Sequence, residues 1–248
     1  IIDGHYQTLT MIQEPPQSRV QRVRHELRRR ALHVVAIDTL SPHVRAITLG
    51  GEALDGFVSA SFDDHVKLIL NADTDTPVMR DYTPRAYDAQ AQRLTIEFAL
   101  HGDGPAARWA ASAQVGDAAV IGGPRGSFVV PMDHDWHLLV GDSSALPAIA
   151  RRLQELPPGA RVWVVADVPP ADRRELPSAA QLTLQWVDGA QACEAAVRAL
   201  ALPVGEGYAW CAGEARTAAS LRQILVEEKG HSRHAIRASA YWKRGAQA

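Results

Sequence analysis

Between residues 32 and 131, apolar and polar side chains alternate in a series of short runs. The clearest is LTIEFAL at 94–100, where Leu94, Ile96 and Phe98 are separated by polar residues. Alternation with a period of two is typical of a half-buried strand, and Gly, Pro and Asp separate the runs. Only residues 106–113 have helical spacing here, so the pattern predicts an antiparallel barrel or sandwich. The expected strands are residues 32–38, 43–50, 64–71, 92–100, 116–122 and 127–131.

From residue 132 onward, apolar runs alternate instead with stretches of helical spacing. HLLVG, RVWVVAD, LTLQWV, YAWCAG and AIRASAYW have the character of buried strands, and residues 146–156, 190–201 and 214–229 that of helices. Alternating strands and helices predict a mainly parallel sheet. We therefore expect a β domain at residues 19–131 and an α/β domain at residues 132–248, preceded by an N-terminal arm at residues 1–18.

Composition narrows the functional classes. The 248 residues are 46% hydrophobic and 22% charged, which suits a globular protein with a sizeable core. The net charge of -2 argues against a nucleic-acid binder, so we interpret the arginine-rich residues 19–30 as a solvated segment. Cys193 and Cys211 lie in no CxxC spacing and suit a reducing compartment. With neither a membrane span nor a signal peptide in the pattern, we expect a cytoplasmic protein.

A candidate anion site follows the strand at 92–100. Residues 101–104 form a glycine-rich turn, and Pro105 stands where a helix can begin without losing a hydrogen bond. Free backbone N–H groups at such a helix start favour an anion. The RDYT segment at 80–83 adds an arginine and a tyrosine just upstream.

Two strand ends in the α/β half carry a second candidate site. Gly141 and Gly213 each end a strand and precede a helix, as a dinucleotide phosphate or nicotinamide requires. The other interpretation is a tight turn with a serine N-cap. GDSSA at 141–145 also resembles a hydrolase nucleophile elbow, with Ser143 as nucleophile. Its acid would be Asp188 and its base His231 or His234.

Two histidine pairs, His134 with His137 and His231 with His234, are spaced by three residues. No cysteine or carboxylate cluster completes a metal-ligand set around either pair. We therefore expect no metal site and interpret both pairs as surface histidines.

Seven short segments, in this order, resemble those of one family of flavoproteins. The two-domain layout is similar to the ferredoxin-reductase type, and the segments resemble the siderophore-interacting protein family of ferric-siderophore reductases. The resemblance extends over roughly residues 20–244. The segments are GGEALDGF (50–57), FDDHVKL (62–68), RDYTPR (80–85), HGDGPAARWA (101–110), GDSSALPAI (141–149), AGE (212–214) and IRASAYW (236–242).

The resemblance implies non-covalent FAD on a six-stranded antiparallel barrel. Arg80 would donate to the pyrophosphate, and Tyr82 would stack on the flavin or ribityl surface. Thr83 would reach the isoalloxazine edge. Small side chains would let the backbone of the glycine-rich turn close on the phosphates. The residues implied at that turn are His101, Gly104, Ala106 and Ala107.

The resemblance also implies a nicotinamide nucleotide as the electron donor. Tyr241 and Trp242 could be core aromatics of a terminal strand, but an exposed terminal aromatic such as Trp242 could also cover a planar cofactor. Asp167 would favour the ribose of NADH, whereas Arg173 and Arg174 could hold the 2′-phosphate of NADPH. We expect NADPH, with NADH or a reduced iron–sulfur protein as alternatives. The residues implied on the nucleotide side are Gly141, Asp142, Ser144, Ala145, Gly213, Glu214 and Trp242.

The implied reaction passes electrons from NAD(P)H through flavin to a ferric siderophore and releases Fe(II). Lys67, Arg125 and Arg237 stand inside the resembling motifs and are expected to converge beside the flavin, where they attract an anionic iron chelate. Alternatively, Lys67 and Arg125 are surface charges on strand ends. A general NAD(P)H flavin or ferredoxin-type reductase is the alternative function. We expect a monomer with no nucleic-acid partner and no membrane insertion.

Overall fold

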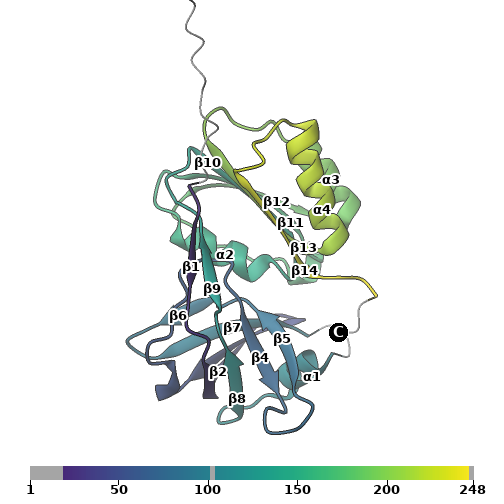
Figure 1. The fold of residues 1–248 in the computed structure, drawn as a ribbon. Coiled ribbons are helices and arrows are strands. Elements are labelled where there is room, and N and C mark those ends of the chain that lie inside the picture. Colours follow the sequence, from purple (N-terminus) through teal and green to yellow (C-terminus); the bar gives the residue numbers. More distant parts are fainter. Residues whose placement is uncertain (1–18, 101–103, 246–248) are drawn as a thin grey trace, which may run out of the picture.

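The computed structural model describes residues 19–100 and 104–245, which form two domains (Figure 1). The predicted N-terminal arm and His101 lie outside these ranges. Within them, the antiparallel strands end at Val129 and the parallel strands begin at Trp136. The proposed domain boundary near residue 131 falls between the two sets. No helix in the described ranges is long and apolar enough to cross a membrane.

The β domain is a curved antiparallel sheet with the strand order β5-β4-β8-β2-β3-β7-β6. Its edge strands β5 and β6 are joined by only three residues, 83–85, so the two edges are held together and the sheet forms the predicted barrel. The strands are β2 (Arg29–Ser41), β3 (Val44–Gly50), β4 (Val66–Leu70), β5 (Val78–Tyr82), β6 (Ala86–Asp88), β7 (Arg93–Ala99) and β8 (Ala118–Gly122).

Three strands of the β half are not indicated by the hydrophobic pattern. β1 (Gln21–Arg24) is exposed along its whole length, β6 has three residues, and β5 consists largely of polar side chains. These segments are extended because their backbones hydrogen-bond to neighbouring strands, not because they bury an apolar face. The barrel sheet therefore has seven strands instead of six, and β1 pairs with β9 (Gly126–Val129) in a separate ribbon.

The barrel interior is filled by one side of each alternating strand. Val34, Ile47, Leu68 and Phe98 are fully or almost fully buried, as the period of two requires. Helix α1 (Pro105–Ser112) packs Ala106 and Ala110 against this core. The predicted helix at 106–113 is confirmed within one residue at each end.

The α/β domain is a five-stranded sheet, β12-β11-β10-β13-β14, in which each neighbouring pair is parallel. The predicted parallel sheet is confirmed. A π-helical turn, Ile224–Glu228, extends the last helix. The strands are β10 (Trp136–Asp142), β11 (Arg161–Asp167), β12 (Gln181–Val187), β13 (Gly207–Glu214) and β14 (Ile236–Trp242). The helices are α2 (Leu146–Glu155), α3 (Ala190–Ala199) and α4 (Ala215–Gln223).

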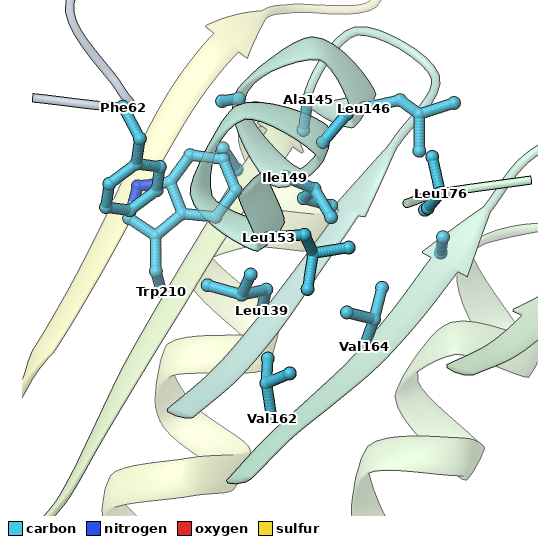
Figure 2. Packing of buried hydrophobic residues seen from close by; sticks show 14 of the residues in the cluster. Phe62, Leu139, Ala145, Leu146, Ile149, Leu153, Val162, Val164, Leu176 and Trp210 are labelled. Carbon is cyan, nitrogen blue, oxygen red and sulfur yellow. The ribbon is translucent and has the colours of Figure 1, made fainter. Parts of the chain in front are cut away.

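Helix α2 lies between the sheet and the barrel, whereas α3 and α4 cover the opposite face (Figure 1). Figure 2 shows Ile149 and Leu153 of α2 pointing onto the sheet. Phe62 of the β domain joins the same cluster, with its ring centroid 5.3 Å from that of Trp210. Phe62 thus extends this cluster of the α/β domain into the β domain, and the shared contact helps to fix the relative position of the two domains.

The first histidine pair is not on the surface, contrary to the sequence-based expectation. His134 is 6% exposed and His137 1% exposed, and the His137 ring lies 3.2 Å from the Met132 carbonyl oxygen. The His134 and His137 rings pack against each other, and His134 also packs against Tyr208. Aromatic contacts explain their burial. Within the described ranges, no group of three or more His, Cys, Asp or Glu side chains could hold a metal ion.

Acidification from pH 7 to pH 4 is expected to destabilise the fold through His137. Burial is the main cause that lowers the pKa of His137 from 6.5 to about 4, and Arg152 adds to the effect. Between these values the unfolded chain binds the proton and the folded chain does not, so stability falls by about 3 kcal/mol as pH falls. The slope of unfolding free energy against pH, measured by urea titration, should flatten in His137→Leu but not in the exposed His234→Leu control. Equal slopes in the two variants would contradict this assignment.

Candidate functional site

A cavity of about 670 Å³ lies between the two domains. This interdomain cavity is bounded on one side by β5, the end of β7 and the loop before β4. On the other side it is bounded by the β10–α2 turn, the segment after β11 and strand β14. Its size is ordinary for a small-molecule or cofactor site. Its principal walls include Asp63, His65, Arg80, Tyr82, Thr83, Glu97, Ser143, Ser144, Leu146, Asp172, Arg174, Arg237, Ser239 and Tyr241.

The RDYT segment forms part of the barrel wall of this cavity. Arg80 stands opposite Leu68 and Tyr82 opposite Val66 in the β4–β5 ladder. The Tyr82 ring packs on Phe98, with 4.4 Å between the centroids, and burial raises the pKa of Tyr82 to about 12. Tyr82 is therefore a neutral, rigidly seated aromatic surface at neutral pH. The predicted cofactor residues Arg80, Tyr82 and Thr83 all line the interdomain cavity.

Tyr241 completes this wall from the other domain and was missed by the sequence reasoning, which selected its neighbour. Its hydroxyl shares a hydrogen bond with the buried Thr83 side chain, and burial raises its pKa. Trp242 instead donates from Nε1 to Asp142 Oδ2 at 2.8 Å. Along a strand, successive side chains point to opposite faces, so only one of two adjacent aromatics can face the cavity.

The predicted anion site at the start of α1 has the expected local geometry. Gly104 is the N-cap and makes no side-chain capping bond, and Pro105 begins the helix. The backbone N–H groups of Ala106 and Ala107 precede the first intrahelical bond, from Arg108 N to Gly104 O, which is 3.0 Å long. Among the described residues, the walls of the interdomain cavity include none from α1.

Asp142 holds together the carboxyl ends of three parallel strands. Its Oδ1 accepts from Ser144 N at 2.9 Å, and its Oδ2 accepts from Glu214 N at 2.9 Å and from Trp242 Nε1 at 2.8 Å. A Cβ on Gly213 would collide with this carboxylate, and φ there is +144°. Asp142 thus requires a glycine at 213 and cross-links β10, β13 and β14.

The remaining residues of the nucleotide side have mainly architectural contacts. Ala145 is fully buried, and a Cβ on Gly141 would come within 2.5 Å of its methyl group. The Glu214 carboxylate caps α4 by accepting from Arg216 N at 2.7 Å and Thr217 N at 3.2 Å. Of the seven predicted residues, only Ser144 has a place in the cavity wall, together with the unpredicted Ser143 and Leu146.

The hydrolase interpretation fails on geometry. Ser143 follows the carboxyl end of β10, whereas His231 packs against Trp136 at the amino end, with 5.3 Å between the ring centroids. The length of β10 separates these two ends by roughly 20 Å at about 3.3 Å per residue. His234 precedes β14 at the same far end. No histidine of the predicted triad can therefore reach Ser143.

The three predicted substrate-binding cations have different environments. Lys67 donates to Asp81 at 2.8 Å on the half-exposed outer face of the barrel. Arg125 is exposed, and its side chain has no hydrogen bond or ion pair within the described part of the chain. Arg237 lines the interdomain cavity, stacks 4.2 Å above Phe128 and pairs with buried Asp63 at 2.8 Å.

Asp63 is a site residue that the sequence did not single out, although it stands in the FDDHVKL motif. It accepts from Ser61 Oγ at 2.7 Å and from Trp210 Nε1 at 3.2 Å, and it forms an ion pair with Arg237 Nε at 2.8 Å. Its side chain is 2% exposed. One carboxylate therefore joins the β domain to β13 and β14 directly beside the cavity.

The residues expected to discriminate NADPH from NADH are engaged within the protein. Asp167 accepts from Gly189 N at 2.7 Å. Arg173 donates to the carbonyl oxygens of Val168 and Val187 at 2.9 and 3.1 Å. Arg174 pairs with Glu97 across the domain interface and lines the cavity. Only Arg174 is thus positioned towards a ligand in the cavity.

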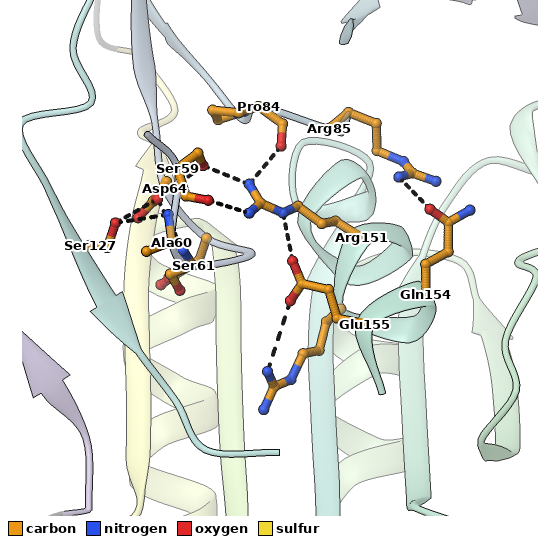
Figure 3. Close-up of polar contacts among 12 residues, drawn as sticks. Ser59, Ala60, Ser61, Asp64, Pro84, Arg85, Ser127, Arg151, Gln154 and Glu155 are labelled. Carbon is orange, nitrogen blue, oxygen red and sulfur yellow. Dashed lines mark hydrogen bonds and ion pairs between the residues drawn. The ribbon is translucent and has the colours of Figure 1, made fainter. Parts of the chain in front are cut away.

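Arg151 of α2 fixes the loop before β4 and the turn that follows β5 (Figure 3). Its guanidinium donates to Ser59 Oγ at 2.7 Å, to Ser59 O at 3.0 Å and to Pro84 O at 2.9 Å. Glu155 pairs with the same side chain at 2.8 Å. The segment that follows Tyr82 and Thr83 is therefore held by the α/β domain.

Two family models match the chain. The siderophore-interacting FAD-binding domain matches residues 33–77 and 71–128, and the siderophore-interacting protein model matches residues 134–245. The matched ranges correspond to the barrel and to the α/β domain.

Relatives and solved structures agree with these matches. The NADPH-dependent ferric-chelate reductase of Escherichia coli is 36% identical over 245 residues, covering 90% of this chain and 96% of that protein. The ferric vibriobactin reductase ViuB of Vibrio cholerae is 32% identical over 243 residues, covering 87% and 90%. A siderophore utilization protein from T. fusca superposes with a TM-score of 0.85 at 32% identity, covering 92% of this chain and 97% of that one.

The fold extends to more distant flavoproteins. The ferredoxin reductase of carbazole 1,9a-dioxygenase superposes with a TM-score of 0.67 at 20% identity, covering 86% of this chain and 69% of that one. This likeness confirms the expected ferredoxin-reductase-type fold. Since both domains are matched and a 36% identical relative is covered almost completely, the chain belongs to the siderophore-interacting protein family.

Proposed function

We propose that the protein is a cytoplasmic, FAD-dependent ferric-siderophore reductase that uses NADPH. The observation that carries this proposal is the interdomain cavity, which has the RDYT segment on its barrel side and the ends of parallel strands on the other. When bound, FAD accepts a hydride from nicotinamide and returns its two electrons one at a time to two ferric ions. Fe(II) is held less tightly by hard oxygen chelators than Fe(III), so reduction releases the metal.

The residues of the barrel side fit an FAD. Tyr82 offers a neutral aromatic surface that Phe98 prevents from turning away, and Thr83 is held beside it by Tyr241. Arg80 lines the same cavity, and among the described residues its side chain donates only to the neighbouring Met79 carbonyl, at 2.8 Å. Its remaining N–H groups can therefore reach a pyrophosphate. We assign the backbone N–H groups after Gly104, at Ala106 and Ala107, to the same phosphates.

Most of the predicted residues on the nucleotide side hold the protein together and do not offer free hydrogen-bond donors to a ligand. Asp142, Gly213, Glu214 and Trp242 fix the carboxyl ends of three strands, and Gly141 and Ala145 let the β10–α2 turn pack closely. This arrangement leaves Ser144 and its neighbour Ser143 to face a nicotinamide in the cavity. Arg174 is the candidate for the 2′-phosphate, and its pairing with Glu97 would orient it.

The substrate is proposed to approach the flavin from the side of Lys67, Arg125 and Arg237. Outer-sphere electron transfer needs proximity and charge attraction rather than a closed pocket, so an exposed arginine such as Arg125 is suited to it. Arg237 and Lys67 contribute less free charge than Arg125, because Asp63 and Asp81 pair with them.

The test is anaerobic reduction followed by a panel of acceptors. The purified protein should take up FAD and turn yellow, and NADPH should bleach it faster than NADH. Ferric siderophores should then restore the colour while a chromogenic chelator traps Fe(II). A colourless protein that takes up no FAD would overturn the proposal. Equal rates with ferredoxin, free flavin and ferric siderophores would instead favour a general reductase.

Tyr82→Ala is expected to weaken FAD binding about tenfold, which corresponds to roughly 1.4 kcal/mol of lost ring contact. Tyr82→Phe keeps the ring and removes only the hydroxyl, so its FAD affinity should stay within a factor of about two of the wild type. Fluorescence titration of the apoprotein with FAD measures both. If the two variants bind FAD equally well, Tyr82 does not stack on the flavin.

A further inference from the structure

Strand β1 places part of the arginine-rich N-terminal segment on the folded protein instead of leaving it as a solvated leader. Gln21 to Arg24 pair antiparallel with Val129 to Gly126, and His25 Nε2 lies 2.7 Å from the buried Ser127 hydroxyl. A Cβ on Gly126 would come within 2.5 Å of the Val23 carbonyl oxygen, so the close approach depends on that glycine. Figure 1 shows β1 and β9 side by side where they run from the barrel towards the α/β domain.

Arg22 and Arg237 share one aromatic ring. Arg22 is the register partner of Phe128, and its guanidinium carbon lies 5.5 Å from the centre of that ring. The guanidinium carbon of Arg237 lies 4.2 Å from the same centre, and Arg237 also lines the interdomain cavity. An aromatic ring attracts cations through its quadrupole without neutralising them. Phe128 therefore holds an arginine of β1 next to a residue of the cavity wall.

Arg24 continues this positive surface, and Arg125 stands next to the register partner of Arg24. Arg24 is two residues after Arg22, so both project from the same face of β1. Its register partner is Gly126, whose preceding residue is Arg125. Asp63 neutralises Arg237, whereas Arg22, Arg24 and Arg125 have no acidic partner among residues 19–100 and 104–245. Three uncompensated charges thus lie on or beside the β1–β9 ribbon, and one of them, Arg22, shares the Phe128 ring with a residue of the cavity wall.

We propose that β1 is part of the substrate site and that Arg22 and Arg24 bind anionic ferric chelates at the mouth of the interdomain cavity. This inference rests on the proposed function, because it concerns the same acceptor. The site selects by charge: a tris-catecholate chelate of Fe(III) carries three negative charges, whereas a tris-hydroxamate chelate with no further ionised group carries none. The chain should therefore prefer the former.

The test compares Arg22→Gln/Arg24→Gln with Arg216→Gln/Arg222→Gln, an equal charge change on α4, where both arginines are exposed. With a ferric tris-catecholate, the KM of the β1 variant should rise about fivefold to tenfold above that of the wild type at low salt. At about 0.3 M salt this difference should shrink, because screening weakens the attraction of the chelate to the arginines of the wild type. With an uncharged ferric tris-hydroxamate, the KM should change less than twofold. The α4 variant should resemble the wild type with both chelates.

The outcomes separate the inference from the proposed function. If the wild type reduces neither chelate, the proposed function fails. If the wild type is active and the β1 variant has an unchanged KM and salt dependence, the role of β1 fails alone. Equal losses with both chelates would also overturn it, because they would indicate a general structural effect. The bound FAD content and the melting temperature of each variant, expected to match those of the wild type, detect such an effect directly.

Discussion

Asp63→Ala should lower the free energy of unfolding by about 4 kcal/mol and strongly slow ferric-chelate reduction. The buried carboxylate accepts hydrogen bonds from Ser61 and Trp210 and forms an ion pair with Arg237. Its removal leaves a guanidinium without its counter-charge and an indole N–H without its acceptor. Breaking one half of a buried ion pair is much more harmful than replacing the whole pair. Urea unfolding and steady-state reduction rates measure the two effects.

The double variant Asp63→Ala/Arg237→Met tests this explanation. It removes the uncompensated charge, so it should recover about half of the lost stability. The control is Asp81→Ala, which removes the exposed partner of Lys67 and should cost less than about 1 kcal/mol. If the double variant is no more stable than Asp63→Ala, the loss arises from packing or from Trp210 rather than from the orphaned arginine.

Arg151→Met should cost about 3 kcal/mol of stability and slow NADPH-driven reduction about tenfold. The side chain is 13% exposed and joins α2 to the Ser59 and Pro84 loops of the β domain. Methionine can fill much of the volume but leaves two carbonyl oxygens without a donor. The turn after Thr83 would then lose its support from the α/β domain. The two walls of the interdomain cavity would no longer be held in fixed positions relative to each other.

Arg161→Met is the matched control for this variant. Arg161 also donates to a carbonyl oxygen, that of Asp135 at 3.0 Å, but at the exposed amino end of the sheet. Arg161→Met should change the free energy of unfolding by no more than about 0.5 kcal/mol, and it should leave the reduction rate unchanged. FAD affinity, measured separately, distinguishes a misplaced nucleotide side from a lost flavin. An Arg151→Met enzyme with wild-type rates would show that the domains keep their relative position without Arg151.

The central strands and helices could be predicted because their side chains show which face is buried. Ile47, Leu94 and Ile96 alternate with outward residues, and Ile149 and Leu153 repeat at helical spacing, so burial leaves a periodic trace in the sequence. β1 and β5 lack that trace. Their conformation comes from hydrogen bonding to β9 and β4, and only the assembled sheet supplies those partners.

The barrel side of the interdomain cavity was predictable for a different reason. Arg80, Tyr82 and Thr83 are adjacent in the chain, so a local motif carries them together into the cavity wall. The α/β side of the cavity and the environment of Arg237 are assembled from residues far apart in the sequence. No short segment of the sequence indicates that Asp63 pairs with Arg237 or that the Arg22 guanidinium packs on the Phe128 ring.

The sequence by itself determined the two-domain architecture, the barrel-side residues of the cavity wall and the family, since these depend on periodicity and contiguous motifs. The tertiary structure decided which of two adjacent aromatics faces the cavity, which glycines admit the Asp142 carboxylate and which arginines keep an uncompensated charge. These outcomes depend on side-chain direction and on partners 70 or more positions away, such as Asp142 with Glu214. Such distances in sequence leave no period to detect.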